Sequence, residues 1–204
     1  MTGGAPLAAG PRGAARAPRR APRRWRAAVV ALLALLLVGA GVTEAALKAA
    51  FVYNFTKLVT WPESALGGPA DAFVVGVVGK NGLGSELEAA LKDKTMGGRQ
   101  IIVRRWQTVD DIAHCHILWL SAEIVADDVA MRRVLQTREV LVVGDAESLA
   151  HRGGMVRLYR ETTDDGVKVR FEFNVEAARN AGLEVSSKLL SLARIVTGAM
   201  PEQH

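Results

Sequence analysis

The stretch FVVGVVGKNGLGSELEAAL, residues 73–91, joins an apolar run to a helical pattern through a turn that carries glycine. Phe73–Val78 contains no polar residue, which predicts a strand buried on both faces, because a strand with one solvated face would alternate apolar and polar residues. A helix is expected near Leu83–Leu91. A buried strand followed by a helix is the repeating unit of a parallel α/β sheet.

The chain on either side of this unit continues the alternation. An amphipathic helix is predicted at residues 45–60, closed by Trp61-Pro62, and a loop at residues 65–71. Runs rich in Val, Ile and Leu predict further parallel strands. These strands are expected at Gln100–Arg104, His116–Leu120 and Val140–Gly144, with a short turn or helix near Val109–Ala113 and a helix near Asp127–Thr137.

The last third of the chain has a different pattern. Met155–Tyr159 and Val167–Phe173 flank the turn residues TDDG and predict an antiparallel hairpin, whose inward residues are Val169, Phe171 and Phe173 and whose outward residues are Lys168, Arg170 and Glu172. The predicted fold class is therefore α/β: a single domain at residues 45–198, with a largely parallel sheet flanked by helices and a C-terminal antiparallel hairpin.

Two helices are expected after the hairpin. Asn174 is a good N-terminal cap for a helix that runs to Asn180, and Gly182 follows as its stop. Ser186 or Ser187 would start a final helix over Lys188–Val196. The apolar residues of that helix, Leu189, Leu190, Leu192, Ala193 and Val196, are expected to bury one side.

The N-terminal 40 residues differ in composition from the rest. They hold seven Arg and no Lys, Asp or Glu, and end in a 14-residue uncharged run at residues 27–40. A basic segment, a short apolar run and small residues form the order of a cleavable secretory signal peptide, so residues 1–40 are predicted to be removed, with the mature start between residues 41 and 47. An uncleaved anchor and a twin-arginine signal, from the paired Arg before Trp25, are the alternatives. All three export the domain, so we expect a periplasmic protein.

The leader also accounts for the basic charge of the chain. Without residues 1–40, 19 Lys and Arg face 21 Asp and Glu, so a net charge of +5 becomes −2. Nucleic-acid binding needs basic residues clustered on the folded domain. No nucleic-acid partner is therefore expected.

His114-Cys115-His116 is the densest cluster of metal-ligand residue types. On a strand the two imidazoles would share one face while Cys115 points away, but a zinc site needs at least one further ligand. The alternative is a structural strand entry with a small buried thiol. Because Cys115 is the only cysteine, no internal disulfide is possible.

The turn GKNGLG, residues 79–84, has the spacing GxxGxG, which is neither a dinucleotide fingerprint nor a phosphate loop. Arg104 and Arg105 would suit a nucleotide phosphate in a matching fold, but export disfavours nucleotide cofactors. The acidic pairs, Asp110-Asp111, Asp127-Asp128 and Asp164-Asp165, suit helix starts and turns. No hydrolase motif is present, so we expect no enzyme, no catalytic residue, no metal and no cofactor.

Four segments in order carry a resemblance to a known family: LKAAFVYNFTKLVTWPE (residues 47–63), FVVGVVGKNGLGSELEAAL (73–91), CHILWLS (115–121), and the C-terminal part from VLVVGDAESLAHRGGMVRLYRE (140–161) to VKVRFEFNVEAARNAGLEVSSKLLSLARIV (167–196). The chain resembles the YfiR-like family of exported regulators. Each segment alone is weak evidence. Their ordered combination is specific and covers nearly the whole mature chain.

The resemblance implies a small periplasmic α/β protein without catalysis. The best-understood members hold an inner-membrane diguanylate cyclase inactive by binding its periplasmic region; release raises cyclic di-GMP and favours biofilm. A sensor histidine kinase is the alternative partner. Family members that use disulfides need more cysteines than this chain has, so internal disulfide control is not expected here.

Four aromatic residues within eleven positions offer a candidate partner-binding patch: Phe51, Tyr53, Phe55 and Trp61. The alternative is that all four lie in the core or cap the helix. Two other functional classes stay open. One is a small-ligand carrier with a cleft at the strand ends Gly79–Gly84, Ser121 and Asp145, and the other is a cytoplasmic nucleotide-dependent enzyme. The hairpin edges permit a homodimer.

Overall fold

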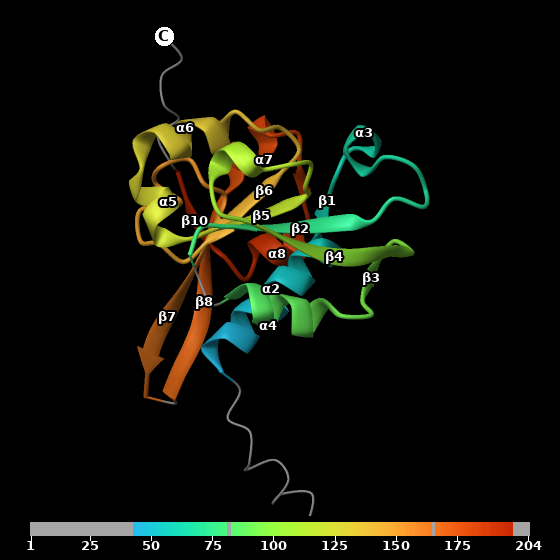
Figure 1. Ribbon diagram of the computed structural model, residues 1–204. Helices are drawn as coiled ribbons and strands as arrows, with labels where there is room; N and C mark the ends of the chain where they lie inside the picture. The colour runs from blue at the N-terminus through green and yellow to red at the C-terminus, as the bar shows by residue number, and fades with distance from the viewer. Residues whose placement is uncertain (1–42, 81–82, 165, 198–204) are drawn as a thin grey trace, which may run out of the picture. The chain divides into compact units, whose positions relative to one another are not determined.

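A mixed eight-stranded sheet organises the chain in the computed structural model, which describes residues 43–80, 83–164 and 166–197. The strand order is β10-β8-β7-β6-β5-β2-β4-β3 (Figure 1). The predicted leader at residues 1–40 lies outside the described residues. The strands of this sheet are β2 (Phe73–Val78), β3 (Thr95–Met96), β4 (Arg99–Trp106), β5 (Ile117–Leu120), β6 (Leu141–Gly144), β7 (Val156–Thr163), β8 (Gly166–Asn174) and β10 (Arg194–Val196).

The centre of the sheet is parallel, as the sequence predicts. β2 pairs in parallel with both β4 and β5, and β5 pairs in parallel with β6. All six residues of β2 are buried, because helices cover both faces of the sheet around this central strand. The α/β class, the mostly parallel sheet and the C-terminal antiparallel hairpin of β7 and β8 are confirmed.

Helices cover the two faces of the sheet. In Figure 1, α2 and α4 lie below the sheet and α5, α6 and α7 lie above it. The helix predicted at residues 45–60 is α2, which ends two residues early, where β1 begins. The helices are α2 (Glu44–Leu58), α3 (Glu63–Leu66), α4 (Leu83–Leu91), the 3₁₀ turn η1 (Val109–Asp111), α5 (Ala122–Ala126), α6 (Asp128–Leu135), α7 (Val175–Asn180) and α8 (Ser187–Leu190).

Side-chain caps fix where several helices begin. Thr43 Oγ1 accepts a hydrogen bond from the Ala46 amide at 3.1 Å, and Asp127 Oδ1 accepts from Val129 at 2.8 Å at the start of α6. Asn174 Oδ1 accepts from the Ala177 amide at 3.0 Å, so the predicted Asn174 cap is confirmed.

The predicted helix at Lys188–Val196 is wrong. The helix α8 stops at Leu190, and β10 then pairs in parallel with β8. The amide of Leu192 bonds back only three residues, to Leu189 at 3.1 Å, which tightens the last turn and ends the helix. Residues 194–196 instead form backbone hydrogen bonds with the edge of β8, whose N–H and C=O groups would otherwise be unpaired on that side. Leu192 and Ile195 are consequently 62% and 51% exposed instead of forming a buried side.

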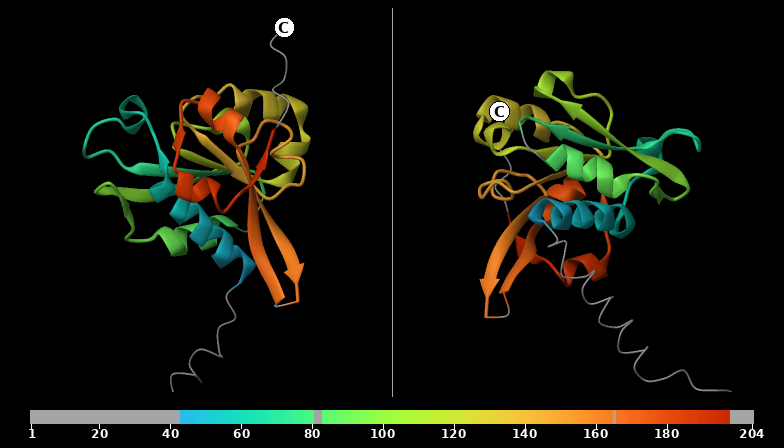
Figure 2. Two further views of the ribbon diagram at one scale, coloured as in Figure 1. Left: turned by 180° about the vertical axis from the view of Figure 1, so that it is seen from behind. Right: turned by 60° about the horizontal axis from the view of Figure 1, so that its bottom comes forward.

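The hairpin extends beyond the body of the domain, as both views of Figure 2 show. At its base Phe171 and Phe173 are buried as predicted, whereas Val167 near its tip is 51% exposed. Glu172 was expected to face solvent but is 3% exposed, because β7 and β10 flank it. Its carboxylate is neutralised by Arg157 at 3.1 Å and Arg194 at 3.6 Å.

A second, two-stranded sheet joins distant parts of the chain. β1 (Val59–Thr60) follows α2 directly and pairs antiparallel with β9 (Glu184–Val185). The amide of Ser186 extends the pairing by donating to the Leu58 carbonyl at 3.0 Å. The end of the first helix is therefore held by a segment close to the C-terminus of the domain.

Candidate functional site

The four aromatic residues predicted as a partner-binding patch separate into two groups. Phe55 is fully buried and Trp61 is 4% exposed, whereas Phe51 and Tyr53 are half-buried at the surface of α2. Phe51 and Phe55 both contact Phe171 of the hairpin, with ring centroids 5.7 Å apart in each pair. Of these four side chains, Phe51 and Tyr53 are the two that keep part of their surface exposed.

Trp61 links the end of α2 to the sheet. Its Nε1–H donates to the His116 carbonyl at 3.1 Å, and its ring meets Phe73 edge-on with centroids 4.9 Å apart. A tryptophan with its N–H satisfied and its ring packed in this way is a core residue. Tyr53 lies instead beneath the ammonium of Lys57, 4.0 Å from the ring centroid.

His114 and His116 lie side by side, with ring centroids 4.8 Å apart. Both Nε2 atoms are 3.0 Å from one acceptor, the Ala65 carbonyl, and His116 Nδ1 accepts from the Val74 amide at 2.9 Å. His116 is therefore a neutral ring protonated on Nε2. Burial lowers the pKa of His116, and the neighbouring His114 lowers it further.

The histidine pair has a structural role in this arrangement. It anchors the segment around Ala65 against the start of β2, and so confirms the structural interpretation of the strand entry. Within residues 43–80, 83–164 and 166–197, no group of three or more His, Cys, Asp or Glu is placed to hold a metal ion. Cys115 between them is 2% exposed, and burial raises the pKa of its thiol to about 12.

The glycine turn after β2 is closed by a carboxylate from the first turn of α5, the helix that follows the neighbouring strand β5. The Lys80 amide donates to Glu123 Oε1, and this bond lowers the pKa of Glu123. Gly79 has a φ of +89°, and a Cβ there would lie 1.9 Å from Ser121 Oγ. A protein carboxylate thus occupies the amide that a phosphate would need. This geometry disfavours the nucleotide alternative.

The small-ligand alternative placed a cleft at the same strand ends. Ser121 is 2% exposed and Asp145 forms an ion pair with Lys48 at 2.6 Å, so both residues are committed to packing or pairing. Of the acidic pairs, Asp127 caps α6 and Asp111 closes a capping box with Thr108. The predicted structural role of these two carboxylates is confirmed.

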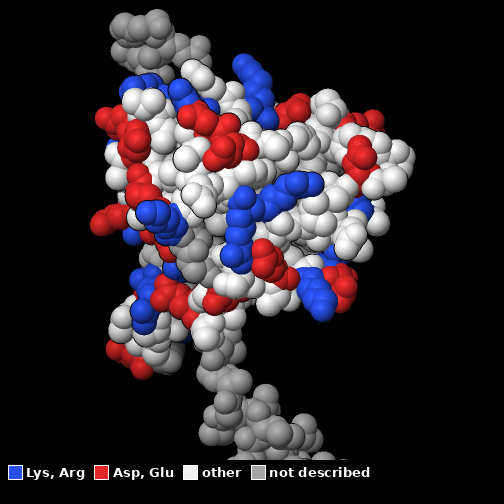
Figure 3. Space-filling view, in the orientation of Figure 1, with Lys and Arg blue, Asp and Glu red and all other residues white. Residues whose placement is uncertain are grey.

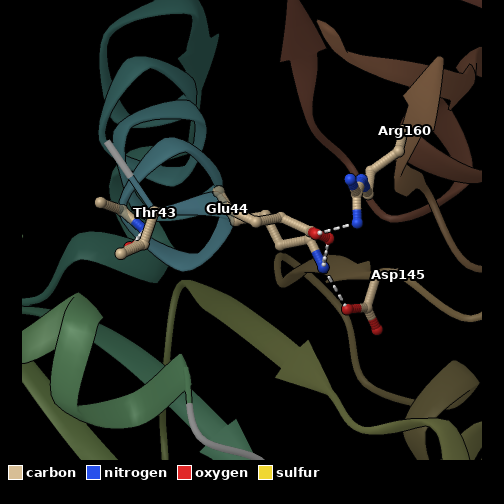
Figure 4. A network of polar contacts seen from close by, with 6 residues as sticks. Thr43, Glu44, Asp145 and Arg160 are labelled. Atoms are coloured by element: carbon tan, nitrogen blue, oxygen red, sulfur yellow. Dashed lines mark hydrogen bonds and ion pairs between the residues drawn. The ribbon is translucent and has the colours of Figure 1, made fainter. Parts of the chain in front are cut away.

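An ion-pair network that the sequence analysis did not single out holds the start of α2 (Figure 4). Lys48 Nζ lies 2.8 Å from Glu44 and 2.6 Å from Asp145, and Glu44 also pairs with Arg160 of the hairpin at 3.2 Å. Lys48 lowers the pKa of Glu44. The four-residue spacing of Glu44 and Lys48 was a readable signal, but the partners Asp145 and Arg160 come from distant elements.

A family model described as YfiR/HmsC-like matches residues 45–194. The chain belongs to the YfiR/HmsC-like family. The match spans the described domain almost from α2 to β10, and no curated protein matches the chain. The predicted resemblance is confirmed.

Members of the YfiR/HmsC-like family are periplasmic regulators rather than catalysts, and they act through a periplasmic partner. No helix among the residues described here is long and apolar enough to cross a membrane. On the face shown in Figure 3, Lys and Arg side chains are interspersed with Asp and Glu, and no single sign of charge covers an extended area.

Proposed function

We propose that this protein is exported to the periplasm, where it binds the periplasmic region of an inner-membrane diguanylate cyclase and holds the enzyme inactive. Cellular cyclic di-GMP then stays low until the complex dissociates. Membership of the YfiR/HmsC-like family carries the proposal, because this family consists of periplasmic regulators that act through a partner. The composition of residues 1–40 supports export.

The contact surface is assigned to the exposed side of α2. Phe51 and Tyr53 keep part of their rings at the surface, and aromatic side chains of this kind often dominate interface energies. Phe55 and Trp61, which belong to the same predicted patch, are buried and are left out of the proposed contact surface. The buried ring of Phe171 at the hairpin base supports Phe51 from the core side.

A deletion strain tests the regulatory function. Cellular cyclic di-GMP is measured in the deletion, and again after complementation with the full chain or with a chain that lacks residues 1–40. A rise that only the full chain reverses supports an exported repressor. No change in cyclic di-GMP would overturn the cyclase proposal and direct attention to a sensor histidine kinase, to be sought by pull-down from membranes.

The contact surface is tested separately with Tyr53→Ala. Tyr53 is half-buried and packs on the margin of the core, so we expect the variant to remain folded with a modest loss of stability. Capture of the membrane partner is expected to weaken by roughly tenfold or more for a dominant contact. Val129→Ala on α6 is the matched control, because Val129 is 55% exposed on another element. Equal capture by the Tyr53 variant and the control would remove Tyr53 from the contact surface.

A further inference from the structure

A cavity of about 420 Å³ opens beside the start of β2 and the middle of β4. Val74 and Ile102, which are paired across these two strands, line it together with Leu66 and Ala113. This volume is in the range of small-molecule sites, which are usually apolar with a few placed polar groups. The cavity lies at the opposite end of the strands from the turns where parallel sheets usually bind ligands.

Arg104 is the positively charged side chain that lines this cavity. It lines the wall, and it makes no ion pair or hydrogen bond with any other residue that the structure describes. Arg105, the next residue along β4, points to the opposite face and pairs with Glu88 at 3.0 Å. Arg99 is also committed, because it donates to the carbonyls of Gly68 and Asp71.

The other polar side chains that line the cavity differ in which of their hydrogen-bonding atoms already have a partner. Both ring nitrogens of His116 are bonded, whereas His114 uses only Nε2 and leaves Nδ1 without a partner among the described residues. Asp71 Oδ2 accepts from the Gly68 amide at 2.7 Å. Because His114 Nε2 donates to a carbonyl, its free Nδ1 is an acceptor and does not bind an anion. The cavity therefore offers the guanidinium of Arg104 as the donor for an anionic ligand.

We propose that this cavity binds a small organic monocarboxylate, whose carboxylate pairs with Arg104 and whose apolar body contacts Leu66, Val74 and Ile102. A planar guanidinium matches a carboxylate with two parallel hydrogen bonds. The carboxylate of Asp71 in the same wall offsets the charge of Arg104, which favours a singly charged ligand over a phosphate dianion. The apolar walls favour an organic body over a small inorganic ion.

The proposal makes this regulator a receptor for a small molecule. The cavity is built by the segment that the histidine pair anchors, and this segment is continuous with Trp61 at the end of α2. The site does not depend on the identity of the membrane partner, so ligand binding and partner binding can be tested independently.

Isothermal titration calorimetry of the purified protein with sodium benzoate tests the site. Benzamide has nearly the same shape without the charge and serves as the control ligand. Benzoate is expected to bind and benzamide not. Arg104→Gln is expected to weaken benzoate binding roughly tenfold or more, since it removes a charge-assisted contact. Arg105→Gln, the matched control on the other face of β4, is expected to leave the dissociation constant within about twofold.

A second variant, Ala113→Leu, places bulk in the cavity and is expected to abolish benzoate binding while Arg104 remains. Circular dichroism melting confirms that each variant is folded; Arg104 and Ala113 are both exposed, so neither change removes core packing. No benzoate binding, binding that survives both substitutions, or displacement of benzoate by equimolar inorganic phosphate would each overturn the proposal.

Discussion

Substitution of Trp61 distinguishes a core residue from a partner contact. The side chain is 4% exposed, so Trp61→Ala removes nearly the whole ring from the core. An area of about 200 Å² at about 25 cal/mol per Å² gives about 5 kcal/mol, and large-to-small core substitutions of tryptophan cost about 3–5 kcal/mol. The lost hydrogen bond adds little, because the His116 carbonyl also accepts from the Leu141 amide at 2.8 Å.

We therefore expect Trp61→Ala to lower the free energy of unfolding by about 3–5 kcal/mol, and Trp61→Phe, which keeps an aromatic ring against Phe73, to lower it by about 1–2 kcal/mol. Urea denaturation followed by far-ultraviolet circular dichroism measures both. Partner capture is then compared under conditions in which each variant is folded, and should be unchanged. A loss of capture with an unfolding free energy within about 1 kcal/mol of the parent would refute the core assignment and make Trp61 a contact residue.

Three further predictions follow from buried or strained positions. Cys115 has a buried thiol with a pKa of about 12, so a thiol reagent at pH 8 should label it only after denaturation; rapid labelling of the native protein would contradict its burial. Gly79→Ala should destabilise the protein by about 1–3 kcal/mol in urea unfolding, because the residue has a positive φ and the added Cβ meets Ser121. Burial is the main cause that lowers the pKa of His116 below its usual value of 6.5. Below about pH 6.5 the folded state therefore binds fewer protons than the unfolded state. The stability that this ring provides is present above about pH 6.5 and falls as the pH drops. The urea midpoint of the parent protein should be lower at pH 5.5 than at pH 7.5, and the decrease should be smaller in His116→Gln. An equal decrease in the two proteins would show that His116 is not its cause.

The elements that the sequence predicted well are those whose patterns are local. β2 has the predicted bounds, Phe73–Val78, because a continuous apolar run is consistent only with a central strand here. Asn174 was recognisable as a cap from its position before a short helical segment. Such features depend on neighbouring residues alone, so one sequence suffices to find them.

The features that the sequence did not predict depend on distant partners. The leucines just before β10, Leu189, Leu190 and Leu192, have a helical spacing that extends to Val196, and pairing with the open edge of β8 makes residues 194–196 a strand. The aromatic spacing in α2 identified a patch, but the burial of Trp61 depends on a carbonyl 55 residues away. The cavity beside Arg104 combines residues from four separate segments, and no motif in the sequence connects them.

The pairing of β1 with β9 constrains the order in which the protein can fold. Val59 meets Val185 across a separation of about 126 residues, and closing a loop of that length costs about 4 kcal/mol of chain entropy. The pairing cannot form until almost the whole polypeptide is available. A chain whose C-terminal part is not yet available would hold α2 without its final anchor, and the end of α2 would stay unpaired until residues 184–186 can reach it.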